Sequence, residues 1–405
     1  MKDIIDIRAD FPILNRKVYD RPLVYFDNGA TTQKPQCVLD AVDEVYESYN
    51  GNIHRGVHFL SDMSSEAYEK SREKVRSFIN ADKREEVVMT SGTTGSINGI
   101  AFSFGERYIN PGDEIILSRL EHHANIVPWQ MMCERKGAVL RVIPINENGE
   151  IILEEYYRLL SSKTKLVSVT QASNALGSIL PIEEIISAAH SINVPVLIDG
   201  AQGIQHGNVD VKLMDSDFYV FSGHKIYGPA GIGVLYGKEK WLSELPPFQG
   251  GGDMVDKVTF EKTTYNELPF KFEAGTMNYP AAIGLARALD YVLSIGRENI
   301  ASREKELLTY LTGRLSGIKD LEIFGKAGNK IPTISFHIKD IHQYDTGVIL
   351  DKMGIAVRTG THCAQPVMDR FGIDGTVRAS LCFYNTKEEI DLLAEGIEKV
   401  KSMFA

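Results

Sequence analysis

Lys225 stands in a sequence context that could make its amine a nucleophile. The segment DFYVFSGHKIYGP is typical of an apolar strand that delivers Ser222, His224 and Lys225 into a turn bounded by glycines. Loss of water around a lysine in such a turn lowers the pKa of its amine, and a neutral amine can attack an aldehyde. A single lysine at a strand end is usually solvated, so this interpretation needs support from other residues.

Two further motifs provide that support. In VVMTSGTTGSIN a predicted strand gives way to a turn over residues 91–95, before a helix resumes near Ile97. The turn offers backbone N–H groups and hydroxyls to a phosphate, although such clusters are more often ordinary loops. In VPVLIDGAQG, Asp199 ends an apolar strand and Gln202 follows. Alone, Asp199 could equally meet a cation or cap a helix.

The three motifs together match the needs of one cofactor. Pyridoxal phosphate requires a nest for its phosphate, an acid for its ring nitrogen and an amine for its aldehyde. Here the phosphate turn comes first, Asp199 follows, and Lys225 stands 26 residues after Asp199. The combination favours pyridoxal phosphate over three unrelated loops.

Cys363 lies in RTGTHCAQPVM, a segment with the composition of a polar loop. A free cysteine is usually a small buried hydrophobe, but His362 and Arg358 nearby favour a reactive thiol. The other cysteines stand in helical contexts or, for the last, in a predicted apolar strand, and we interpret them as core residues: Cys37, Cys133 and Cys382.

Short β-branched runs separated by helical stretches recur through the first two thirds of the chain. This alternation predicts βα units around a mostly parallel sheet, whose ligands gather at the carboxyl ends of the strands. The motifs described above stand at such ends. The predicted strands cover residues 87–90, 114–118, 140–145, 165–170, 194–199, 217–222 and 231–236.

From about residue 290 the pattern changes to charged amphipathic helices with a few strands, including residues 333–338. Thr386 and Glu389 form a capping-box pattern at the start of a last helix. Its apolar positions recur at helical spacing: Ile390, Leu393, Ile397, Val400 and Phe404.

These observations predict the following domain organisation. Residues 1–25 form an N-terminal segment that packs with the small domain, residues 26–289 a large cofactor-binding domain, and residues 290–405 a small α+β domain that carries the cysteine loop. Residues 249–275 look like a long excursion near a dimer interface.

Composition excludes several classes of protein. The net charge of -10, from 44 basic and 54 acidic residues, argues against nonspecific nucleic-acid binding. No window reaches the roughly 18 apolar residues of a membrane span, and the first segment, MKDIIDIRADFP, lacks the apolar stretch of a signal peptide. The four cysteines are far apart and form no C-x-x-C pair, so we expect no metal site and a reducing cytoplasm.

Over nearly its whole length the sequence resembles the fold-type I pyridoxal-phosphate enzymes of the class V aminotransferase group. Within that group it is similar above all to the Suf-system (group II) cysteine desulfurases and their selenocysteine lyase relatives. The resemblance rests on motifs that occur in one order: YFDNGATTQKP, HRGVHFLS, SGTTGSIN, EHHANIVPWQ, DGAQ, SGHKIYGP, EAGTMN, RTGTHCAQP and VRASL. It implies an α/β fold with a large, mostly parallel seven-stranded sheet domain and a smaller α+β domain.

The resemblance also implies a role for each cofactor-binding residue. Lys225 would bond covalently to the cofactor aldehyde, Asp199 would pair with the ring nitrogen, Gln202 would bond the phenolic oxygen, and His122 would stack on the ring. The phosphate would be held by Thr93, Thr94, Ser222 and His224, with Thr276 reaching in from the neighbouring subunit. The last assignment implies a homodimer.

Three further residues match the positions that bind the substrate carboxylate in this family: Asn174, Arg358 and Arg378. The planar fork of arginine suits that task. His54 and Arg55 line the same cleft in relatives, and the resemblance gives them no definite role.

The implied activity is that of a cysteine desulfurase, which converts L-cysteine to L-alanine and leaves the sulfur on Cys363 as a persulfide for iron–sulfur cluster assembly. Lys225 would carry the α-proton and His122 would act as an acid or base. Many relatives have two histidines directly before the cysteine, whereas this chain has Thr361, which leaves the tuning of the thiol pKa open. The cysteine loop is short, which is typical of enzymes that pass sulfur to a dedicated transfer protein of the Suf system.

Other activities remain open at this stage. A selenocysteine lyase would share the carboxylate and amine contacts, so L-selenocysteine is an alternative substrate. Another class V enzyme, such as an aminotransferase, would have no need of Cys363. A noncatalytic sulfur carrier or scaffold could lose Lys225 or Asp199, so their presence argues against it.

Overall fold

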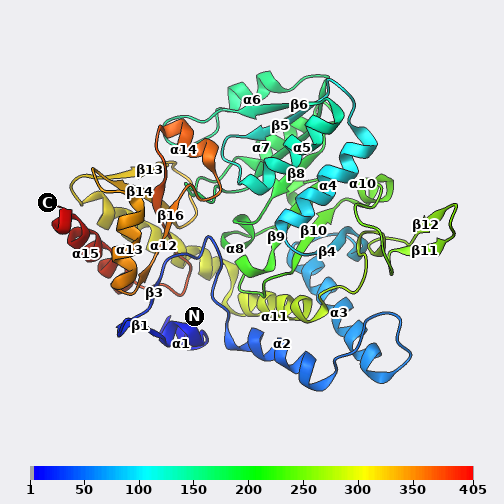
Figure 1. Ribbon diagram of the computed structural model, residues 1–405, viewed down its shortest axis with the longest axis horizontal. Coiled ribbons are helices and arrows are strands. Elements are labelled where there is room, and N and C mark those ends of the chain that lie inside the picture. Colours follow the sequence, from blue (N-terminus) through cyan, green and yellow to red (C-terminus); the bar gives the residue numbers. More distant parts are fainter. Residues whose placement is uncertain (1–3, 405) are drawn as a thin grey trace.

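The computed structural model describes residues 4–404, and its largest element is a seven-stranded sheet (Figure 1). The strand order is β4-β10-β9-β8-β7-β5-β6, and β10 alone runs antiparallel to its neighbours. The predicted mostly parallel sheet is therefore confirmed. Its strands are β4 (Val87–Thr90), β5 (Glu114–Ser118), β6 (Val139–Ile143), β7 (Thr164–Thr170), β8 (Val196–Asp199), β9 (Phe218–Ser222) and β10 (Gly233–Gly237).

Helices connect these strands and complete the first part of the chain. Helix α11 packs against both α2 and α3, and α4 packs against α5, β9 and β10. The helices of this part are α2 (Gln36–Ser48), α3 (Phe59–Phe78), α4 (Thr93–Tyr108), α5 (Val127–Lys136), α6 (Leu153–Leu159), α7 (Ile182–His190), α8 (Gly203–His206), α9 (Val211–Met214), α10 (Glu239–Glu244) and α11 (Tyr279–Ile295). One-turn 3-10 helices are η1 (Pro12–Asn15), η2 (Arg84–Glu86), η3 (His123–Asn125), η4 (Gly223–Lys225) and η5 (Phe270–Phe272).

A second sheet, antiparallel and four-stranded, lies in the later part of the chain, on the left of Figure 1. Its order is β13-β14-β17-β16, and α12, α13 and α15 pack around it. A separate hydrophobic cluster fills the space between this sheet and its helices. The elements are α12 (Arg297–Ser316), β13 (Leu321–Phe324), β14 (Thr333–Ile338), α13 (Gln343–Lys352), β15 (Ile355–Ala356), β16 (Arg358–Gly360), α14 (Gln365–Phe371), β17 (Thr376–Ser380) and α15 (Lys387–Phe404).

The N-terminal segment lies beside this second part. Strand β3 (Val24–Tyr25) pairs in parallel with β15, and Arg8 in α1 (Ile4–Ala9) forms an ion pair of 2.9 Å with Glu389 in α15. Strands β1 (Lys17–Val18) and β2 (Arg21–Pro22) form a small hairpin between them. Residues 1–3 of the predicted N-terminal segment lie outside the described residues. The domain boundaries at residues 25 and 289 stay a prediction.

The excursion predicted over residues 249–275 contains a hairpin of β11 (Val255–Val258) and β12 (Thr263–Tyr265), which projects from the body of the molecule at the right of Figure 1. Among the helices of residues 4–404, none combines the length and the apolar composition that crossing a membrane requires.

Two local expectations about helices prove wrong and one is confirmed. Helix α4 begins at Thr93, earlier than the predicted start near Ile97, because Gly92 takes a φ of 142° and turns the chain directly into the helix. Phe404 is exposed, because the last turn of α15 extends beyond the core. The capping box is present: Thr386 accepts from the Glu389 N–H, and Glu389 accepts from the Thr386 N–H.

Candidate active site

The predicted site residues converge on one pocket of about 290 Å³ at the carboxyl ends of the central strands. Strands β7, β8 and β9 end at Thr170, Asp199 and Ser222, and all three residues line it. The second part of the chain closes the other side. Of the residues predicted for the site, those that line this pocket are Thr93, Thr94, His122, Asn174, Asp199, Gln202, Ser222, His224, Lys225, Arg358, Cys363 and Arg378.

Lys225 ends the short helix η4 and faces the pocket. Burial lowers the pKa of its amine to about 8; the carboxylate of Asp199 raises this pKa, and the charge of Arg378 lowers it. A much larger fraction of the amine is therefore neutral near pH 7 to 8 than at a solvated lysine. The environment expected from the strand-end turn is present.

The predicted phosphate turn, residues 91–95, leads into α4 and is hydrogen-bonded to the end of β9. The N–H of Thr93 donates to the Ser222 hydroxyl oxygen over 2.8 Å, and the two hydroxyl oxygens are also 2.8 Å apart. Gly92 lets the chain approach this closely, because an added Cβ would lie 3.2 Å from the Ser222 hydroxyl oxygen. Since α4 has 16 residues, its positive N-terminal end adds to the attraction for an anion.

Asp199 is buried at the end of β8, where its Oδ1 accepts the Ala201 N–H over 2.9 Å. Burial raises the pKa of Asp199, while the Ala201 N–H and the charge of Lys225 lower it. A cationic ring nitrogen beside this carboxylate would supply the charge that the buried group needs.

His122 caps η3 and lines the pocket as a neutral ring. Burial lowers the pKa of His122 to about 3, and the charge of Lys225 lowers it further. Its Nδ1 accepts the N–H of Ala124 over 3.0 Å, so the ring hydrogen is on Nε2. Any proton that His122 gives to a ligand must therefore leave from Nε2.

The two predicted carboxylate-binding arginines share a partner that the sequence reasoning missed. Asp27 accepts from Arg378 Nη2 and from Arg358 Nε, each over 3.0 Å. Arg378 is buried and also donates to the carbonyl oxygen of Asn174, whereas the Arg358 side chain is 45% exposed. Asp27 lies in the motif YFDNGATTQKP, which supports the family resemblance but does not by itself indicate what Asp27 does.

Cys363 is exposed on a short loop whose backbone is held from both sides. Its carbonyl oxygen accepts the N–H of His123 over 2.7 Å, and Asn174 Nδ2 donates to the carbonyl oxygen of His362 over 2.6 Å. Both His362 and Cys363 have a φ of 54°, a left-handed conformation that costs energy in residues with a side chain. The contacts therefore hold the thiol at the pocket in a strained turn.

The other cysteines do not line this pocket. Cys133 and Cys382 are buried in hydrophobic clusters, and burial raises the pKa of each thiol. Cys37 is half-buried in α2, and burial raises its thiol pKa as well. Cys382 is not in a strand as predicted, because β17 ends at Ser380 and the chain then turns into the core.

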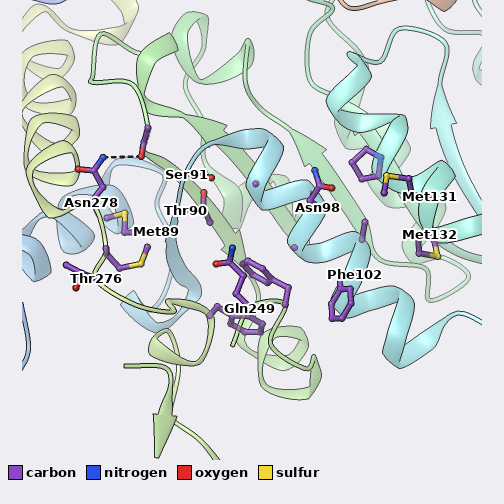
Figure 2. A pocket seen from close by; sticks show the side chains of 18 of the residues that line it. Met89, Thr90, Ser91, Asn98, Phe102, Met131, Met132, Gln249, Thr276 and Asn278 are labelled. Atoms are coloured by element: carbon purple, nitrogen blue, oxygen red, sulfur yellow. Dashed lines mark hydrogen bonds between the residues drawn. The ribbon is translucent and has the colours of Figure 1, made fainter. Parts of the chain in front are cut away.

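Three residues that the family resemblance associates with the site do not line this pocket: Thr276, His54 and Arg55. Thr276 donates to Asn52 and lines a second cavity (Figure 2), and its action on a neighbouring subunit stays a prediction. His54 pairs with Glu69 over 3.2 Å, and Arg55 forms an ion pair with Asp253.

The pocket fits pyridoxal phosphate on a feature independent of the motifs. Four buried polar atoms of its lining have no hydrogen-bond partner among residues 4–404: Asn174 Oδ1, Gln202 Oε1, His362 Nδ1 and Arg378 Nε. Buried polar atoms are normally paired, so the site calls for a polar ligand. Lys225, Asp199 and the Thr93 turn supply the amine, acid and phosphate groups that this cofactor requires.

Comparison with known proteins places the chain in a family. Residues 24–393 match the family model of class-V aminotransferases, which confirms the predicted use of pyridoxal phosphate. Over 99% of its length the chain is 52% identical to a cysteine desulfurase of Synechococcus elongatus, of which it spans 64%. Over 97% of its length it is 48% identical to a cysteine desulfurase of Escherichia coli (strain K12 / DH10B), of which it spans 97%.

The solved structures that this chain resembles are also cysteine desulfurases. The cysteine desulfurase CsdA of Escherichia coli superimposes with a TM-score of 0.93 at 36% identity, covering 100% of this chain and 99% of that one. A cysteine desulfurase of Thermococcus onnurineus NA1 superimposes with a TM-score of 0.94 at 38% identity, covering 99% of each chain. The chain therefore belongs to the class-V aminotransferase family and, within it, to the cysteine desulfurases.

Proposed function

We propose that this chain converts L-cysteine to L-alanine and takes the sulfur onto Cys363 as a persulfide. The observation that carries the proposal is the position of Cys363: an exposed thiol on a held loop that lines the same pocket as Lys225 and Asp199. Bound pyridoxal phosphate supplies the electron sink that labilises the α-proton of an amino acid. The remaining tasks fall to residues of the chain.

Lys225 is the proton carrier, because its amine has a pKa lowered to about 8 by burial and exchanges protons readily near neutral pH. Asp199 would keep the ring nitrogen of the bound cofactor protonated, Gln202 would bond its phenolic oxygen, and His122 would stack on the ring. Arg378 and Arg358 bind the substrate carboxylate, with Asn174 beside them.

In the sulfur step Cys363 is the nucleophile, and the electron-sink chemistry of bound pyridoxal phosphate would make the substrate C–S bond cleavable. The Cys363 thiolate attacks the substrate sulfur, so that an S–S bond forms and the substrate C–S bond breaks. The electron pair of the broken bond goes to the carbon skeleton, which takes up a proton and leaves as alanine. The enzyme retains one extra sulfur on Cys363.

We further propose that the enzyme acts as a homodimer in the cytoplasm. Thr276 and Asn278 line a cavity of about 470 Å³ together with Phe102 and Met131, whose side chains are 41% and 59% exposed (Figure 2). A partner subunit packed there would cover these apolar groups and receive Thr276 at its phosphate site. The free thiol of Cys363 suits a reducing compartment.

The sulfur acceptor is proposed to be a transfer protein of the Suf system that supplies iron–sulfur cluster assembly. The loop between β16 and α14 is short, and His123 and Asn174 bond its backbone. Because the loop has little freedom to swing outward, the acceptor must come to Cys363. Addition of such a protein should therefore accelerate turnover on cysteine.

The cofactor assignment is tested by the visible absorption spectrum of the purified protein. Wild type should absorb at about 400–430 nm, and Lys225→Ala should lose this band. Lys330→Ala is the matched control, since Lys330 is another largely buried lysine whose pKa burial lowers to about 8 but which lies outside the pocket. A band that persists in Lys225→Ala and disappears in Lys330→Ala would move the cofactor to the other lysine.

A further inference from the structure

A buried carboxylate next to the ring-stacking histidine has no role in the chemistry described above. Glu121 is 0% exposed and accepts hydrogen bonds from three donors. These are the Ser118 hydroxyl, the Thr170 N–H over 3.0 Å and Asn125 Nδ2 over 2.7 Å. Within residues 4–404 no cation lies at ion-pair distance from Glu121, so hydrogen bonds alone offset the cost of burying this group.

The direction of these bonds is fixed by Asn125. Its Oδ1 accepts from Trp129 Nε1 over 2.9 Å and from the Ser168 hydroxyl over 2.6 Å. An indole N–H only donates, so the amide oxygen of Asn125 must face Trp129 and its Nδ2 must face Glu121. The contacts therefore require an acceptor at Oε2 of Glu121. Burial raises the pKa of Glu121 to about 8, and the hydrogen bonds from Ser118, Asn125 and Thr170 lower it.

The turn that this network holds forms two walls of the pocket. His122 lies next to Glu121 and lines the pocket. His123 donates its N–H to the carbonyl oxygen of Cys363 over 2.7 Å, and its Nε2 accepts the N–H of Gln365 over 3.1 Å. A displaced turn would therefore move the ring-stacking histidine and the cysteine loop together.

We propose that Glu121 is a positioning residue that, through Asn125, fixes residues 122–125 and so sets the placement of His122 over the cofactor and of the Cys363 loop beside it. The inference rests on the proposed function for the roles of His122 and Cys363. It assigns Glu121 itself no contact with substrate or cofactor.

A swap of two groups tests the proposal. In Glu121→Gln the new amide nitrogen faces either Asn125 Nδ2 or the Thr170 N–H, so two donors meet in both orientations and the turn shifts. In the double variant Glu121→Gln/Asn125→Asp, the new amide nitrogen donates to the new carboxylate, whose other oxygen still accepts from Trp129 and Ser168. Every hydrogen bond is thereby kept while the carboxyl group moves by one side chain.

Two measurements report on the placement of His122 and of the Cys363 loop without depending on catalytic turnover. The first is the visible circular dichroism of the bound cofactor, and the second is the rate at which iodoacetamide alkylates Cys363, measured by peptide mass spectrometry. Glu121→Gln should weaken the dichroic band about twofold or more and change the alkylation rate about threefold or more, and the double variant should restore both. Unchanged values in Glu121→Gln, or a folded double variant no closer to wild type, would overturn the proposal.

A double-mutant cycle that combines Glu121→Gln with His122→Ala distinguishes an effect on the position of His122 from a general loss of protein stability. Once His122 is absent, Glu121→Gln should cause no further loss of the dichroic band, whereas a fully additive loss would contradict the proposal. If Glu121→Gln does not fold, Ser118→Ala removes one donor and the same two readouts apply. A failure of the proposed function is distinguishable, because cysteine would then leave no sulfur on Cys363 of the wild type while both readouts still respond to Glu121.

Discussion

Asp27 holds the buried guanidinium of Arg378 from a position 351 residues away in the chain, with 3.0 Å between Oδ1 and Nη2. The same carboxylate accepts from Arg358. This arrangement fixes the orientation of two cations at the site proposed for the substrate carboxylate. The net charge of the three groups is still positive, so the site keeps its attraction for an anion.

Asp27→Asn should therefore raise the KM for cysteine about tenfold with a smaller effect on kcat, because Arg378 and Arg358 lose their shared ionic partner. Steady-state kinetics measured beside Asp43→Asn, a change at an exposed position of α2, checks this. A KM that falls would mean that Asp27 merely competes with the substrate.

Covalent loading of the apoprotein should depend on pH through Lys225. Below its pKa of about 8 the amine is protonated and unreactive, so the rate of cofactor attachment should rise with pH up to about 8 and then level off. Stopped-flow absorbance after mixing apoprotein with pyridoxal phosphate measures the rate. A rate that keeps climbing toward pH 10 would show that the amine is solvated.

Asp199→Ala should bind cofactor but lose α-proton chemistry. Without a carboxylate at the end of β8 the ring nitrogen loses its proton, and the rate of α-hydrogen exchange should fall by about two orders of magnitude or more. Proton NMR of an amino acid in deuterated buffer measures the exchange separately from the sulfur step. Wild-type exchange in Asp199→Ala would contradict the role given to this residue.

The sequence predicts the sheet well because its strands are short, β-branched and bounded by turn residues. The predicted residues 87–90 and 114–118 coincide with β4 and β5, and the ligands gather at the strand ends as parallel topology requires. The start of α4 was misplaced because a helix that begins on Thr93 and Thr94 has weak local signals, and Gly92 alone sets its first turn.

What the sequence could not show is which side chains act in support of others. Asp27, His123, Glu121 and Asn125 all stand in recognised motifs, but each also has a partner far away in the chain, which is Arg378, Cys363, Thr170 or Ser168 respectively. A contact such as Asp27 with Arg378 arises because the segment after β3 runs beside β17, and no local pattern encodes it. The strained backbone of His362 and Cys363 likewise follows from contacts on both sides of the loop.

The central claim concerns the thiol of Cys363, which separates a desulfurase from other enzymes of the family. Cys363→Ser should bind cofactor and cysteine with normal spectral changes, since those steps use Lys225, Asp199 and the arginines. Alanine formation should then fall by orders of magnitude, because a hydroxyl is a much weaker nucleophile than a thiolate. Cys382→Ser, a change in the core, is the matched control.

The most direct measurement is peptide mass spectrometry of the wild-type enzyme after brief treatment with L-cysteine, followed by alkylation of all thiols. We expect one extra sulfur on the peptide that contains Cys363, and none on the peptides of Cys37, Cys133 and Cys382. Extra sulfur on Cys382, or alanine release by Cys363→Ser at the wild-type rate, would contradict it.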